Sequence, residues 1–239
     1  MDANGYRSDL ARELGADARE RLVRYAQVWT TSDPDSPSAP STERQLDLSR
    51  LLLEELSALG LDAELSDAGI VYGTLPGNRD APTIGLVAHV DTSPDVSGEN
   101  VKPQVFRYEG GPHALPGDPS QVLDPDEWPE LANHVGHELI SSDGTTLLGA
   151  DDKAGVAEIM AAVSYLVRNP DVRRAPVSRR VRRVRSEPLS PAAGILDAAV
   201  RSLRAGERVA AARAASVVTG LPRPPLVPRR PVDTIALRW

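Results

Sequence analysis

The chain has 239 residues, an ordinary apolar fraction of 41% and a formal net charge of −7, and this length is enough for one large domain or two small ones. The absence of cysteine excludes a disulfide framework and a thiolate metal site. The polar, acidic N-terminus is unlike a signal peptide, and no apolar run approaches the roughly 18 residues of a membrane helix, so we expect a soluble, cytoplasmic protein.

The first half of the chain predicts two helices and then two short strands. Residues Asp9 to Trp29 have helical apolar spacing. After a Pro/Ser-rich loop, Thr42 and Gln45 have the spacing of a capping box, which predicts that a second helix begins there. Gly60 supplies its C-terminal stop. The apolar stripe of this helix consists of Leu48, Leu52, Leu56 and Leu59. The segments LDAEL and GIVYGTLPG then predict strands.

The next elements are a buried strand, a long loop and a third helix. The continuous apolar run from Ile84 to Val90 is typical of a strand buried on both faces. Residues 98–119 form a Gly/Pro-rich excursion that is too long for an idle connection, so we expect it to be functional or mobile. Residues Ala154 to Val167 have helical spacing again. Together these elements predict an α/β fold with a mixed sheet flanked by helices.

A histidine and an aspartate follow the predicted buried strand. His89 and Asp91 are two residues apart, so both side chains face the same side of an extended segment. A neutral imidazole is a good zinc ligand, and a carboxylate on its second nitrogen fixes its orientation. Taken alone, the pair favours a different interpretation, a capped core histidine beside a turn-forming aspartate.

Two adjacent carboxylates, Asp151 and Asp152, precede the third helix between small residues. One carboxylate can bridge two divalent ions, and bound cations would reverse the repulsion between the two charges. The alternative is a solvated N-cap, because the helix macrodipole also favours negative charge at this end. The residues alone leave both interpretations open.

Three segments carry a family resemblance: PSTERQLDLSRLLLEELSALGL, GLVAHVDTSPDVSGENVKPQV and GHELISSDGTTLLGADDKAGVAEIM. They resemble peptidase T, the tripeptide aminopeptidase family of the co-catalytic zinc exopeptidases. The likeness covers about residues 10–177. It implies a zinc exopeptidase-like catalytic domain that is incomplete in this chain.

The resemblance also implies roles for particular residues. His89 would be a ligand of one zinc, Asp91 its orienting catalytic carboxylate, and Asp151 the bridge between two zincs. Asp152 and Lys153 match the motif and are expected to support the site. The family's Asp-Asp step is commonly a cis peptide. The implied reaction removes the N-terminal residue from tripeptides, with a zinc-activated water and a glutamate as general base.

The chain departs from the family after Val177–Ser178. There the family continues into a motif with two consecutive glutamates, the general base and a ligand of the second zinc. This chain instead reads RRVRRVRSEPLSPAAGIL, in which Glu187 is isolated and does not match. We therefore expect an incomplete two-zinc site, weak metal binding and no activity from this chain alone.

The charge changes at the same place. Residues 173–239 contain 15 Arg, no Lys and 4 acidic residues, a net charge of +11, whereas the residues before them carry −18. We divide the chain into residues 1–178, part of the catalytic domain, and residues 179–239, a disordered Arg/Ala/Pro-rich tail. Our hypothesis is that this tail is read out of frame or replaces the family's sequence, and reading the encoding DNA in the other frames from codon 178 tests it.

Three functions remain open. The chain is a peptidase T-type enzyme acting on tripeptides, a catalytically dead product that keeps weak metal binding, or a protein whose basic tail binds nucleic acid or an anionic membrane. We expect the tripeptide as partner, and neither nucleic acid nor membrane. The other histidines, His113, His134 and His137, match no ligand position and are expected at the surface.

Overall fold

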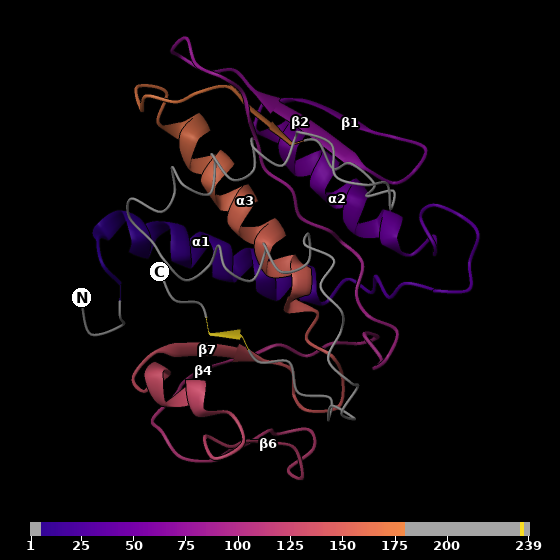
Figure 1. The fold of residues 1–239 in the computed structure, drawn as a ribbon, viewed down its shortest axis with the longest axis vertical. Helices are drawn as coiled ribbons and strands as arrows, with labels where there is room; N and C mark the ends of the chain where they lie inside the picture. The colour runs from indigo at the N-terminus through magenta and orange to yellow at the C-terminus, as the bar shows by residue number, and fades with distance from the viewer. Residues whose placement is uncertain (1–5, 180–234, 237–239) are drawn as a thin grey trace, which may run out of the picture. The chain divides into compact units, whose positions relative to one another are not determined.

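The computed structural model describes residues 6–179 and 235–236 (Figure 1). Its helices are α1 (Asp9–Ala26), α2 (Gln45–Ala58), the 3-10 helix η1 (Pro129–His134) and α3 (Ala150–Arg168). Its strands are β1 (Asp62–Leu65), β2 (Val71–Leu75), β3 (Ile84–Gly85), β4 (Gln104–Arg107), β5 (His113–Ala114), β6 (Val122–Leu123), β7 (Glu138–Ser141), β8 (Val177–Arg179) and β9 (Ile235–Ala236). Within the described ranges, no helix is both long and apolar enough to cross a bilayer.

The prediction of a mixed α/β fold is confirmed. Four strands form a sheet in the order β1-β2-β8-β3. β1 pairs with β2 and β2 with β8 in antiparallel fashion, while β8 and β3 run parallel. The three α-helices and this sheet enclose the main hydrophobic core, in which α1 packs along α3 (Figure 1). The core includes Leu22, Tyr25, Leu48, Leu52, Leu56, Val156, Met160 and Val163.

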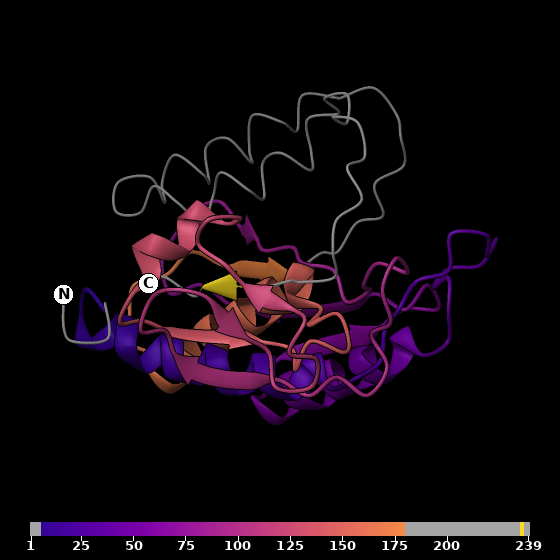
Figure 2. The same ribbon diagram turned by 90° about the horizontal axis from the view of Figure 1, so that it is seen from below.

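A second, smaller core is built from the excursion at residues 98–119 and the residues that follow it. β4 pairs with β7, β5 pairs with β6, and β9 lies along the other edge of β7 (Figure 2). The residues buried there are Tyr108, Leu115, Leu123, Leu131 and Leu139. The excursion is therefore a structural part of the domain. Most of the predicted tail at residues 179–239 lies outside the described residues, so that division of the chain stays a prediction.

Helix α1 ends at Ala26, three residues before the predicted end at Trp29. The chain turns away because its next backbone groups pair elsewhere. The Thr92 N–H donates to the Thr30 carbonyl at 3.2 Å, within a short parallel bridge between Thr31 and Thr92. This bridge ties the end of α1 to the residues that follow His89.

The predicted capping box of α2 is wrong. The helix begins at Gln45, and no side chain caps its N-terminus. The Thr42 hydroxyl instead donates to the Thr31 carbonyl at 2.9 Å, and the Gln45 side chain donates to the Ser41 hydroxyl oxygen at 2.9 Å. Both partners of the expected box are therefore engaged with the preceding loop.

The predicted C-terminal stop of α2 is confirmed. Gly60 has a φ of +78°, a left-handed conformation that glycine adopts without a steric penalty. The Gly60 N–H donates to the Ser57 carbonyl at 2.9 Å, and the Leu61 N–H donates to the Leu56 carbonyl at 3.1 Å. These two bonds form a Schellman motif, which satisfies helix carbonyls and turns the chain toward β1.

The predicted buried strand at residues 84–90 is wrong in extent and in burial. Only Ile84 and Gly85 pair, with Val177 and Ser178 of β8. Ile84 is 39% exposed and Val87 is 58% exposed. A strand is buried on both faces only when elements cover both, and in the described part of the chain β3 stands at an edge of its sheet with one face open.

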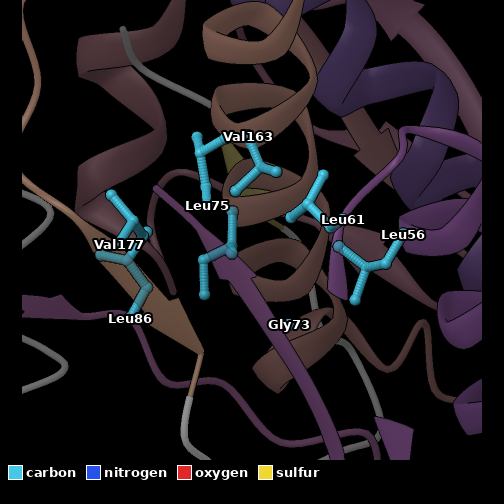
Figure 3. A pocket seen from close by; sticks show the side chains of 8 residues that line it. Leu56, Leu61, Gly73, Leu75, Leu86, Val163 and Val177 are labelled. Carbon is cyan, nitrogen blue, oxygen red and sulfur yellow. The ribbon is translucent and has the colours of Figure 1, made fainter. Parts of the chain in front are cut away.

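A small cavity lies between α2, α3 and the sheet (Figure 3). It is lined by Leu56, Leu61, Gly73, Leu75, Leu86, Ile159, Val163 and Val177. Its volume is about 10 Å³, roughly the space of one water molecule, and its walls are almost wholly apolar. Its lining residues offer no side-chain polar group that could orient a substrate.

A polar cluster connects α1 to α2. The Tyr25 hydroxyl, on a side chain with 0% exposure, donates to Glu55 Oε2 at 2.6 Å. Arg21 and Arg24 also donate to the Glu55 carboxylate. Arg21 is held on its other side by Asp17 at 2.8 Å. One carboxylate on α2 therefore satisfies three donors from α1.

We predict that Tyr25 makes the protein less stable in strong alkali. Burial, followed by the bond to Glu55, raises the pKa of Tyr25 to about 12. The folded chain therefore keeps a proton between pH 10 and pH 12 that the unfolded chain has lost, so this stabilisation is complete below pH 10 and disappears toward pH 12. The expected loss is on the order of 2–3 kcal/mol. Urea unfolding of the Tyr25→Phe variant should show a shallower decline across this pH range than the unaltered chain, and equal slopes would contradict the prediction.

Candidate metal centre

His89 lies in the segment after β3, with acidic groups at both ring nitrogens. Its Nε2 is 3.1 Å from Asp151 Oδ1. Its Nδ1 is 3.0 Å from the Asp91 backbone carbonyl and 3.2 Å from the Asp91 carboxylate. These contacts raise the pKa of His89 to about 10, with the hydrogen bond to Asp151 as the largest cause. In the absence of a metal the ring therefore carries a proton that a cation would have to displace.

Asp151 reaches His89 because the chain is not helical at the start of α3. The backbone of Asp151 has φ −89° and ψ 102°, that of Asp152 has φ −123° and ψ 32°, and the peptide between them is cis, as the resemblance implied. The Asp151 side chain is 82% exposed and faces the imidazole. Its hydrogen bond to His89 holds the pKa of Asp151 below its ordinary value.

Gly149 positions this turn. Its φ is +75°, a left-handed conformation that disfavours other residues. A Cβ at this position would also lie 2.9 Å from Thr92 Cγ2. The loop that carries Asp151 thus approaches the residues next to His89 closely because position 149 has no side chain.

Asp152 has a different environment from its neighbour. Burial is the largest influence on its carboxyl and raises its pKa, while the charge of His89 and the nearby backbone of His89 and Gly155 act in the opposite direction. A Cβ on Gly155 would lie only 2.3 Å from Asp152 Oδ1, so a side chain at position 155 would displace this carboxylate. The Asp152 carboxylate therefore lies against Gly155 in the first part of α3, whereas the Asp151 carboxylate contacts the His89 ring. Two adjacent carboxylates are tolerated because each has its own partners.

The Lys153 side chain is buried in the core and does not contact the His89–Asp151 pair. It is 1% exposed, and its ammonium donates to the Val28 carbonyl at 2.7 Å, near the end of α1. Burial lowers the pKa of Lys153 to about 8. The expected supporting role, which stays a prediction, would be to fix the start of α3 against α1.

The remaining histidines lie apart from His89. His113 in β5 stacks on Phe106, with ring centroids 4.0 Å apart, and His134 meets His137 edge to face at 5.7 Å. All three are half-buried, whereas we expected surface positions. Packing within the smaller core accounts for the difference.

The described residues bring together two direct ligand candidates, His89 and Asp151. No group of three or more His, Cys, Asp or Glu side chains able to hold a metal occurs among them. Sequence reasoning paired His89 with Asp151 and offered a helix cap as the alternative for both aspartates, but it missed their different surroundings and the left-handed conformation of Gly149. The small residues that flank the two aspartates were the available signal.

Comparison with known proteins finds peptidase T relatives. The chain is 50% identical over 162 residues to a peptidase T from Geobacillus thermodenitrificans, a match that spans 66% of this chain and 39% of that protein. It is likewise 50% identical over 161 residues to a peptidase T from Staphylococcus aureus. Over this part of its length the chain is similar to peptidase T. The predicted resemblance is thereby confirmed.

The match leaves more than half of each peptidase T relative without a counterpart in this chain, since it spans 39% of their length. Among solved structures, an aminopeptidase PepT from Bacillus cereus aligns with a TM-score of 0.46 and 21% identity, covering 69% of this chain and 35% of that one. No protein-family model matches the chain.

Proposed function

We propose that residues 6–179 supply part of the metal site of a peptidase T-type tripeptide aminopeptidase, with His89 and Asp151 as zinc ligands. The 3.1 Å separation of His89 Nε2 from Asp151 Oδ1 carries this proposal. Two ligands about 2.0–2.1 Å from a tetrahedral zinc lie about 3.3 Å apart, so the pair needs almost no rearrangement to share one ion. The charge of the carboxylate and the softer imidazole nitrogen suit that metal.

Asp91 has the position of an orienting residue. Its carboxylate lies 3.2 Å from His89 Nδ1, so it holds the ring with Nε2 directed at Asp151. The contact with His89 also holds the pKa of Asp91 below its ordinary value, which keeps this group a carboxylate near neutral pH. Zinc, when bound, would polarise a peptide carbonyl and activate a water molecule.

The described residues support weak binding better than catalysis. A catalytic zinc takes three protein ligands, and two converge here. No glutamate of the described part contacts the His89–Asp151 pair in the manner of a general base. We therefore favour a chain of peptidase T descent whose site binds a divalent ion weakly and does not complete the reaction alone. The proposed role of the basic tail falls outside the described residues.

A tripeptide-release assay tests this proposal. With zinc added, the 239-residue chain is expected to release no more free N-terminal amino acid than its Asp151→Ala variant. A peptidase T of full length, assayed under the same conditions, shows that the assay can detect turnover. Zinc-dependent turnover that is abolished by Asp151→Ala would show instead that this chain is an active enzyme.

A further inference from the structure

Lys153 is a charged side chain in an almost fully buried place. It is 1% exposed, and within the described ranges the hydrogen-bond partner of its ammonium is the Val28 carbonyl at 2.7 Å. No carboxylate of those ranges offsets the burial, which is the sole cause of the lowered pKa of this lysine. A buried charge without a charged partner costs folding free energy, and an apolar side chain of similar length would avoid that cost. Stability by itself therefore does not account for a lysine at this position.

The carbonyl that Lys153 contacts belongs to residues 28–32, the connecting segment that follows α1. Figure 1 shows the end of α1 beside the start of α3. The connecting segment also binds the residues that follow His89, because the Thr92 N–H donates to the Thr30 carbonyl at 3.2 Å. Thr30 and Thr92 are 0% and 2% exposed, so water does not compete for this bond. The connecting segment is thus bonded both to the start of α3 and to the chain just beyond His89.

These segments meet at Gly149. A Cβ at this position would lie 2.9 Å from Thr92 Cγ2 and 3.6 Å from Lys153 Nζ, so the loop before Asp151 lies against both side chains. The Asp151 side chain is 82% exposed, and among the described residues its carboxylate contacts the His89 ring. Packing around the carboxylate cannot hold an exposed group in place. The position of Asp151 therefore depends on the backbone that carries it.

We propose that Lys153 is a positioning residue that sets the separation of His89 and Asp151 for a divalent cation such as zinc. The proposal rests on the ligand pair given under the proposed function. The Lys153 ammonium holds the backbone next to Asp151 against the connecting segment, and the connecting segment holds the residues that follow His89. One segment thereby places both members of the pair, whose Nε2 and Oδ1 atoms are 3.1 Å apart. Lys153 itself contacts neither of them.

A double-mutant cycle on the full 239-residue chain tests this role, with zinc affinity measured by calorimetric titration at neutral pH. Lys153→Met removes the ammonium and keeps a straight side chain of similar size. It is expected to lower the affinity by about fivefold, and by less than Asp151→Ala does. In the Asp151→Ala background the same substitution should have no further effect, because the group through which it acts is already gone. An unchanged affinity in Lys153→Met would overturn the proposal, as would an equal loss in both backgrounds.

Val163→Ala is the matched control for a general loss of packing. Val163 is 5% exposed and lies about 15 Å along α3 from Lys153, so the substitution leaves a cavity in the same helix far from Asp151. Urea unfolding should show a loss of stability in Val163→Ala, while its zinc affinity stays unchanged. Lys153→Met is expected to show the reverse, because the cost of burying the charge disappears together with the bond. Equal losses of zinc affinity in the two variants would show that Lys153 acts only through overall stability.

X-ray absorption at the zinc edge supplies a second measurement. Lys153→Met should keep the imidazole nitrogen in the zinc shell and lose carboxylate oxygen, as Asp151→Ala does, and a shell equal to that of the unaltered chain would overturn the proposal. If circular dichroism shows that Lys153→Met is unfolded, Lys153→Arg takes its place, since it keeps a cation and moves the donor, and the same losses are expected. Equal zinc affinity of Asp151→Ala and the unaltered chain would instead refute the ligand pair itself, which separates failure of the proposed function from failure of the positioning role.

Discussion

Replacing Asp151 with alanine is expected to lower the zinc affinity of the chain by more than about tenfold. The reason is geometric: with Asp151 removed, His89 Nε2 loses the oxygen that lies 3.1 Å away, and the described residues offer no group of three ligands to replace it. Calorimetric titration with zinc at neutral pH measures the difference. The unaltered chain is itself expected to bind weakly, well short of nanomolar affinity.

Two control variants separate this effect from nonspecific binding. Asp171→Ala removes an exposed carboxylate beyond the end of α3, and His137→Ala removes an imidazole of the smaller core. Both should leave the zinc affinity unchanged. Equal affinities for the Asp151→Ala variant and the unaltered chain would refute the proposed ligand pair, and nanomolar binding of two ions would show that the site is complete.

Replacing Glu55 with alanine is expected to have the largest effect on stability, a loss of about 3 kcal/mol in the free energy of unfolding. Its carboxylate accepts bonds from Tyr25, Arg21 and Arg24, and its side chain is 17% exposed. Removing it leaves a buried hydroxyl and a guanidinium that is 13% exposed without this acceptor. Urea unfolding followed by circular dichroism gives the free energy.

Glu54→Ala is the matched control for this experiment. Glu54 is the preceding residue of α2 and is exposed, so the substitution removes the same side chain without disturbing the contact between α1 and α2. Its effect is expected within about 0.5 kcal/mol of zero. Equal losses of stability in the two variants would contradict the role given to the polar cluster, because alanine does not lower the helix propensity at either position.

The helices could be predicted from the sequence because their information is local. The apolar stripe of α2 and the stop at Gly60 follow from helical spacing and from the conformational freedom of glycine. The capping box failed because Thr42 has a distant partner, the Thr31 carbonyl, which sequence spacing cannot reveal. The end of α1 was misplaced for the same reason, since pairing between Thr30 and Thr92 decides it.

The burial of residues 84–90, unlike the helices, could not be predicted from local sequence. Its composition reports the environment in which such a segment is stable, with both faces covered. Whether the cover is present depends on elements distant in sequence, and Val87 remains 58% exposed. The composition thus indicates that the segment is suited to burial on both faces, but it does not indicate whether other elements cover those faces.

The candidate site could be predicted in part. The family resemblance placed His89 and Asp151 on one ion, and their proximity agrees with it. The residues alone had left open whether the two aspartates cap a helix or hold a metal. The structure separates the two carboxylates, because that of Asp152 lies against Gly155 while that of Asp151 faces His89. That division depends on a backbone turn at Asp151 that no periodicity predicts.

X-ray absorption at the zinc edge tests the shared coordination most directly. The account predicts that the zinc-loaded chain has one imidazole nitrogen and one carboxylate oxygen at about 2.0–2.2 Å, with water completing the shell. The imidazole signal should disappear in His89→Ala and the number of carboxylate oxygens should fall in Asp151→Ala. A zinc shell that is the same in both variants and in the unaltered chain would contradict the account.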